Sequence, residues 1–134
     1  MATRFGLCVF AVLVLIGCTQ TKTAVVGTWV MTESSRKYVP AQLKGPTPKL
    51  VINSDGSFSA SNLPGAFDGS FEIISNSGQG KWTRLTDEGR DELQLNFDGD
   101  YGTQVYVSNS WGGPTLFYFL DDPDEGLRIE LKKA

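Results

Sequence analysis

The strongest constraint on the fold is the alternation of apolar and polar residues along short segments. Residues 92–97 read Glu-Leu-Gln-Leu-Asn-Phe, and residues 127–132 read Leu-Arg-Ile-Glu-Leu-Lys. Alternate side chains of a β-strand point to the same face, so each segment predicts a strand with one face in a core. No segment of ten or more residues after residue 24 carries the 3.6-residue stripe of an amphipathic helix. The sequence therefore predicts an all-β domain.

Turn-forming residues divide this part of the chain at short, regular spacing. Asp55-Gly56 suits a tight hairpin, and further turns are expected at residues 76–78, 87–89, 98–100, 112–114 and 121–126. The alternation between them predicts nine strands, over residues 25–31, 49–53, 57–60, 70–75, 80–85, 93–97, 103–108, 115–120 and 127–131. Sequential antiparallel strands without a covering helix are most simply closed into a small up-and-down β-barrel, with a two-sheet β-sandwich as the alternative.

One long interruption separates the first two expected strands. Residues 33–48 contain Pro40, Gly45, Pro46 and Pro48, which disfavour regular secondary structure. We expect a long loop or a short helical turn that crosses one end of the barrel.

The N-terminal residues carry a targeting signal. Arg4 supplies a positive charge, residues 5–16 are apolar apart from Gly6, and Leu15-Ile16-Gly17-Cys18 resembles the bacterial lipobox. The apolar run is shorter than the roughly 20 residues that span a bilayer. An ordinary secretory signal would prefer a small residue where Leu15 stands. The resemblance implies cleavage before Cys18 and a diacylglyceryl group on its thiol, and two or three acyl chains form a stable membrane anchor.

This signal fixes the expected organisation and location of the protein. We expect a lipoprotein signal peptide over residues 1–17, a lipidated tether over 18–24 and one β-barrel domain over 25–134. The residue after the lipidated cysteine is Thr19. Gram-negative lipoproteins use aspartate at that place for inner-membrane retention, so the resemblance implies the bacterial cell envelope, and the outer membrane facing the periplasm in a Gram-negative cell.

Composition excludes several kinds of chemistry. Without Arg4 the mature chain keeps 11 basic and 15 acidic side chains and no basic run, so nucleic acid is a poor partner. Cys8 leaves with the signal, Cys18 becomes a thioether, and histidine is absent. No thiol, disulfide or histidine base remains, so an enzyme would have to use carboxylates, lysine or tyrosine. Nearly all the acids lie in turns and nothing singles out a catalytic pair, so we expect no enzyme, no cofactor and no metal. The acidic turn at 121–126 departs from the EF-hand pattern, because Pro123 and Gly126 break its register.

Several motifs resemble those of lipocalins and of small uncharacterised bacterial lipoproteins with lipocalin-like barrels. Gly27-Thr28-Trp29 resembles the lipocalin Gly-x-Trp signature, and residues 50–58 and 80–82 resemble strand motifs of lipocalin-like bacterial domains. Residues 101–104 and 118–129 resemble the lipoproteins. The resemblance implies that a C-terminal basic residue stacks over Trp29, and Arg128 is the candidate. The alternation around Arg128, however, puts it on the face opposite to the apolar set of its strand.

The candidate contact residues lie in one region. Residues 115–120 are apolar on both faces of the expected strand, so something must cover the second face. The 33–48 loop or the bilayer could cover it, or the face could be an aromatic ligand lining or a recognition surface. The predicted contact residues are Tyr106, Trp111, Phe117, Tyr118 and Phe119.

Two functional hypotheses follow, both for a binding module. In the first, the barrel interior or its mouth holds a small apolar or amphipathic ligand. In the second, the aromatic surface contacts an envelope protein, as in an inhibitor, an immunity partner or an assembly accessory. A cavity of a few hundred Å³ would favour the ligand, whereas a filled core would favour the surface.

Overall fold

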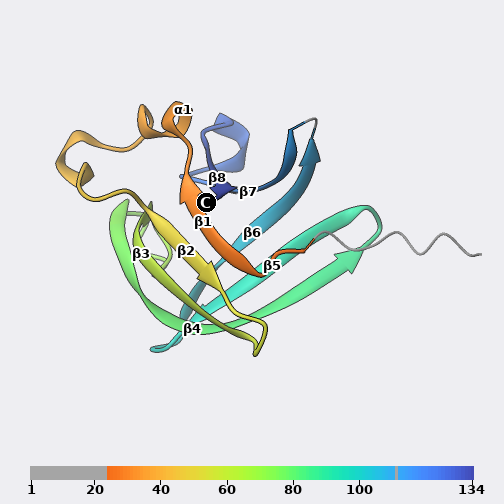
Figure 1. The fold of residues 1–134 in the computed structure, drawn as a ribbon. Coiled ribbons are helices and arrows are strands. Elements are labelled where there is room, and N and C mark those ends of the chain that lie inside the picture. Colours follow the sequence, from red (N-terminus) through yellow and green to blue (C-terminus); the bar gives the residue numbers. More distant parts are fainter. Residues whose placement is uncertain (1–23, 111) are drawn as a thin grey trace, which may run out of the picture.

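The computed structural model describes residues 24–110 and 112–134, so the predicted signal peptide, the predicted lipidation site Cys18 and the candidate contact Trp111 lie outside the described residues. Eight antiparallel strands form a closed up-and-down barrel in which each strand pairs with its neighbours in sequence (Figure 1). Pairing of β1 with β8 closes the wall, with Trp29 opposite Lys133. The predicted all-β barrel is thus confirmed, and the sandwich is not formed. The strands are β1 (Gly27–Met31), β2 (Lys49–Ile52), β3 (Ser57–Gly65), β4 (Ile74–Asp87), β5 (Arg90–Phe97), β6 (Tyr101–Ser110), β7 (Gly113–Phe119) and β8 (Arg128–Lys133).

The prediction of nine strands was wrong in one region. No strand begins at residue 70, and the turn expected at residues 76–78 lies inside β4, which runs unbroken from residue 74 to residue 87. Asn76 and Gly78 look like turn residues, but both take part in the ladder with β3, opposite Leu63 and Ala60. Between these two pairs β3 carries one extra residue, a β-bulge with Asn62 in the left-handed region at φ 56°.

An up-and-down barrel places successive connections at alternating ends. We call the end at which the chain enters β1 the near end. It carries the chain's C-terminus as well. The opposite, far end carries the connections 32–48, 66–73, 98–100 and 120–127. The first of these holds the helix α1 (Glu33–Arg36) and a 3₁₀ turn, η1 (Ala41–Leu43), as expected for this stretch (Figure 1). The last holds η2 (Pro123–Glu125). No helix within the described ranges has both the length and the apolar character to span a membrane.

Mostly apolar side chains pack inside the barrel. Inward-facing residues of all strands are almost completely buried, including Trp29, Phe58 and Tyr118. The Trp29 ring is packed under the near end: its Nε1 donates a 2.8 Å hydrogen bond to the carbonyl oxygen of Val25, which is itself buried. At the far end Phe67 folds back over the core and meets Tyr118 edge to face at 5.4 Å between ring centroids. These contacts join the two ends of one hydrophobic core, in which buried side chains from the strands pack against one another.

Candidate functional site on the outer wall and far end

The alternation of β7 divides the predicted contact residues between two environments. Tyr118 points inward, is 1% exposed and donates a 2.8 Å hydrogen bond from its hydroxyl to the Pro64 carbonyl oxygen. Burial raises the pKa of its phenol above the ordinary value. Tyr118 is therefore a core residue, and its prediction as a ligand or partner contact is corrected.

The residues on either side of Tyr118 point outward and form what we call the aromatic cluster, consisting of Tyr106, Phe117 and Phe119. Tyr106 lies opposite Phe117 in the β6–β7 ladder, and their rings stack at 5.2 Å. Phe119 meets the other two rings edge to face, at 5.8 Å from Tyr106 and 6.0 Å from Phe117. All three side chains are partly exposed. The structure thus gathers three of the predicted contact residues on the outer wall.

The predicted stacking of Arg128 on Trp29 is not formed. Ile129 and Leu131 point into the core, so Arg128 points outward, as the alternation requires. Its guanidinium lies 4.8 Å from the centroid of Phe117 and pairs with Glu130 at 2.7 Å. The basic residue at Trp29 is Lys133, whose ammonium lies 5.6 Å from the ring. A C-terminal cation therefore does meet the tryptophan, but from a position five residues later.

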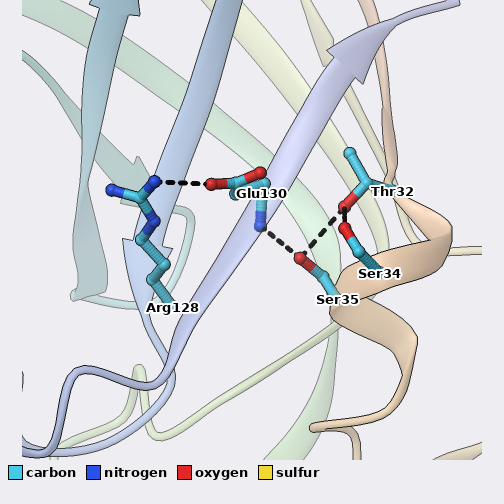
Figure 2. A network of polar contacts seen from close by, with 5 residues as sticks. All are labelled: Thr32, Ser34, Ser35, Arg128 and Glu130. Carbon is cyan, nitrogen blue, oxygen red and sulfur yellow. Dashed lines mark hydrogen bonds and ion pairs between the residues drawn. The ribbon is translucent and has the colours of Figure 1, made fainter.

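A polar network fixes the strand that carries Arg128 (Figure 2). The Ser35 hydroxyl of α1 accepts a 2.9 Å hydrogen bond from the Glu130 backbone N–H and a 3.0 Å bond from the Thr32 hydroxyl. The Thr32 hydroxyl also lies 3.1 Å from that of Ser34. The 32–48 connection is thereby tied to β8, and Arg128 extends on the side of Glu130 toward the aromatic cluster.

The connection 66–73 displays a fourth aromatic ring. Its residues 68–71 read Asp-Gly-Ser-Phe, and one carboxylate oxygen of Asp68 accepts hydrogen bonds from the backbone N–H and the hydroxyl of Ser70, at 3.0 and 2.6 Å. These bonds hold the pKa of Asp68 below its usual value. Phe71 follows with a left-handed backbone, at φ 61°, and is 93% exposed.

Contacts at its base hold this connection in place. The buried amide nitrogen of Asn76 donates to the carbonyl oxygens of Leu63, Gly65 and Ile74, at 2.9, 3.0 and 3.2 Å. The ring of Phe67 lies against Gly65, where a side chain would collide with it. The connection therefore starts and ends at fixed points, although no strand pairs with its central residues.

A hollow of about 360 Å³ lies between this connection and the end of β7, and we call it the rim hollow. It lies where the β6–β7 ladder has ended, because the ladder runs only from Ser110–Gly113 to Tyr106–Phe117. Phe119 belongs to both the hollow and the aromatic cluster, so the two surfaces are continuous. The hollow is lined by Ala66, Phe67, Gly69, Phe71, Thr103, Phe119, Leu120, Asp121 and Asp122.

The connections that line the rim hollow are acidic. Three of the four far-end connections, 66–73, 98–100 and 120–127, hold eight carboxylates and no lysine or arginine. The ion pairs Arg84–Asp91 and Arg128–Glu130 use none of them. Among the residues that the structure describes, no three acidic side chains converge into a group that could hold a metal.

Comparisons with known proteins add no functional assignment: no protein-family model, no curated protein and no solved structure matches the chain.

Sequence reasoning missed three residues that shape this region. Phe71 was placed in a strand, Asn76 in a turn, and Lys133 was passed over in favour of Arg128. One signal could have drawn attention to Phe71: the tetrapeptide Asp-Gly-Ser-Phe occurs both at residues 55–58 and at residues 68–71.

Proposed function

We propose that this protein is a lipid-anchored protein-interaction module of the bacterial cell envelope that binds its partner through the aromatic cluster and has no catalytic role. The observation that carries this proposal is the contrast between a barrel whose inward-facing side chains are buried and an outer wall with three partly exposed aromatic rings. Clusters of aromatic residues with a neighbouring arginine are typical of protein interfaces. Arg128, which lies over Phe117, supplies that arginine.

The position of the chain termini supports this role. The chain enters β1 at the near end, so a lipid on Cys18 would leave only residues 18–24 between the membrane and the barrel. A tether of seven residues spans at most about 25 Å. It would hold the near end toward the bilayer, and the far end would then face the aqueous compartment.

The anchor is tested directly. In cells labelled with radioactive palmitate, the wild-type chain should incorporate label and Cys18→Ser should not. Equal labelling of both chains would show that the lipid, if any, is attached elsewhere.

The interaction surface is tested by photo-crosslinking in cells. The photoreactive residue p-benzoylphenylalanine is placed at Phe117, or at Thr83, which is exposed on the outer side of β4. We expect protein adducts from position 117 that are absent from position 83 and that weaken when Phe119→Ala is added. Identical adducts from both positions, or no protein adduct from position 117, would contradict the proposal.

A second candidate function is the binding of a small amphipathic ligand. The volume of the rim hollow falls at the lower end of the range for ligand pockets, about 300 to 1,000 Å³. Native mass spectrometry after incubation with envelope lipid extract tests this candidate. A retained small molecule that is lost in Phe71→Ala would favour the ligand, and recovery of the bare protein would count against it.

A further inference from the structure

We propose that the rim hollow receives a basic segment of the partner protein, in which lysine or arginine residues flank a large apolar side chain. This inference rests on the proposed protein-interaction role and specifies the chemistry of the partner. Three observations carry it: the shape of the hollow, the display of Phe71 and the distribution of charge.

The hollow offers apolar surface to an inserted group. Phe67 and Leu120, which are buried, and Phe119, which is partly exposed, contribute to its lining. Apolar side chains that bind in such places contribute most of the affinity of an interface, because they leave water completely. The partner should therefore present at least one large aliphatic or aromatic residue.

Phe71 is held in a position that folding does not explain. An exposed phenylalanine gains nothing from the hydrophobic effect, and a left-handed conformation costs a non-glycine residue about 1 kcal/mol or more. The bonds between Asp68 and Ser70 and the amide of Asn76 nevertheless fix the connection on which Phe71 stands. A ring that is displayed in this way beside a hollow loses its exposure when a partner covers it.

The acidic surroundings select a basic partner. Asp121 and Asp122 line the hollow, and Asp68 and Glu72 lie on either side of Phe71 in sequence. Asp124 and Glu125 belong to the same connection as Asp121 and Asp122, whereas basic residues of the far end lie in the connection 32–48 and at Arg128. Such a potential attracts lysine and arginine, repels acidic segments and weakens as salt is added. The exposed ring of Phe71 can also accept a cation over its face.

Peptide binding to the purified full-length protein in detergent tests the inference. The probe is fluorescein-labelled Gly-Lys-Lys-Trp-Leu-Lys-Lys-Gly, followed by fluorescence anisotropy. One control peptide has glutamate in place of each lysine, and another has alanine in place of tryptophan and leucine. We expect the probe to bind at least about tenfold more tightly than either control, and added salt to weaken its binding.

Matched variants locate the site. Phe71→Ala and the double variant Asp121→Asn/Asp122→Asn should each weaken binding about fivefold or more, and the double variant should also flatten the salt dependence. Leu85→Ala and the double variant Asp87→Asn/Glu88→Gln change exposed residues toward the near end, and they should bind as the wild type does. Equal losses in both sets, or binding that is indifferent to Phe71, would overturn the inference.

Failure of this inference can be distinguished from failure of the proposed protein-interaction role. If crosslinks from position 117 to the cellular partner persist unchanged in Phe71→Ala and in Asp121→Asn/Asp122→Asn, the module has a partner but the rim hollow does not bind it. If the acidic control peptide binds as well as the probe, or if envelope lipid displaces the probe completely, the occupant is not a basic segment.

Discussion

The tetrapeptide Asp-Gly-Ser-Phe occurs at opposite ends of the barrel, and its two phenylalanines have opposite environments. Both aspartates accept the same two hydrogen bonds from the serine two residues later, at 2.9 and 2.6 Å for Asp55 and at 3.0 and 2.6 Å for Asp68. Phe58, however, is 1% exposed, whereas Phe71 is 93% exposed. The local turn is therefore the same in both copies, and something beyond it decides where the ring goes.

Strand pairing makes the difference. The first turn joins β2 to β3, and Phe58 lies in a ladder opposite Ile52 on one side and Gly80 on the other. The second turn follows the end of β3, and the β3–β4 ladder has its last pair between Gly65 and Ile74. No pairing holds Phe71 in an extended conformation. The comparison shows that hydrogen bonds within the turn fix the conformation of Asp-Gly-Ser, whereas pairing with neighbouring strands decides where the phenylalanine side chain lies.

The same substitution should therefore have very different effects in the two copies. Phe58→Ala removes a buried ring that contacts Phe97 edge to face, at 4.9 Å, and should lower the free energy of unfolding by about 3 to 5 kcal/mol. Phe71→Ala should change it by no more than about 0.5 kcal/mol. Urea denaturation followed by tryptophan fluorescence measures both values, and comparable losses would show that Phe71 packs against the protein in solution.

The order of the second turn should depend on the hydrogen bonds of Asn76 at the two ends of the connection 66–73, since no strand ladder holds that turn. Asn76→Ala leaves the carbonyl oxygens of Leu63 and Gly65 without their buried donor and should cost about 2 to 3 kcal/mol. Hydrogen exchange should also become faster in residues 66–73 than in the first turn. Asn96→Ala, at an exposed asparagine of β5, is the control and should be neutral. Unchanged exchange in residues 66–73 would argue against the role given to Asn76.

Tyr118 gives a smaller effect that depends on pH. Tyr118→Phe removes the hydrogen bond to the Pro64 carbonyl oxygen, which lies just before the connection 66–73. The substitution should lower the free energy of unfolding by about 1 to 2 kcal/mol. Burial raises the pKa of Tyr118 in the folded state. The protonated phenol therefore stabilises the fold fully at pH values below its pKa in the unfolded chain, about 10, and this stabilisation is lost as the pH rises above that value. Wild-type stability should therefore fall more steeply above that pH than the stability of Tyr118→Phe. Parallel curves in alkaline urea titrations would contradict this assignment.

The smallest expected difference lies between the two aspartates. Hydrogen bonds from the serine hydroxyl and backbone N–H lower the pKa of both Asp55 and Asp68. At pH values above the ordinary carboxyl pKa of about 3.9, each ionised carboxylate therefore stabilises its turn. This stabilisation is lost as the pH falls below that value. Titration of the carboxyl carbons by NMR should show both groups below the ordinary value. An ordinary value for Asp68 alone would mean that the second turn is looser than the first.

The sequence predicts the barrel well because its strongest signal is the period of two. The alternation at residues 92–97 and 127–132 requires a sheet with one buried face, and the absence of a helical stripe leaves the barrel as the simplest closure. It also predicts which residues of the 115–120 segment share a face. What it does not predict is which face becomes the surface, since Phe117, Tyr118 and Phe119 are all large and apolar.

The errors have a common physical origin. Residues 70–73 alternate between polar and apolar side chains as the first Asp-Gly-Ser-Phe copy does, yet no strand pairs with them, because the β3–β4 ladder ends at Gly65 and Ile74. Asparagine is typical of turns, but Asn76 lies buried beside the β-bulge at Asn62 and donates hydrogen bonds to three backbone carbonyl groups. Lys133 replaces Arg128 at Trp29 because register, which the sequence does not reveal, decides which C-terminal residue faces the ring. Each error concerns long-range pairing and none concerns local preference.

The entry of the chain at the near end has a mechanical consequence. If a partner pulls on the far end while a lipid holds residue 18, the force enters through Gly27 and runs along β1, which is paired with β2 and β8. Hydrogen bonds between antiparallel strands lie across the strand direction, so such a force loads all of them together in shear. Forced unfolding would then require both ladders of β1 to break at once, and its rate is set by the unfolding rate constant. With the proposed anchor and partner in place, the barrel would bear tension between them.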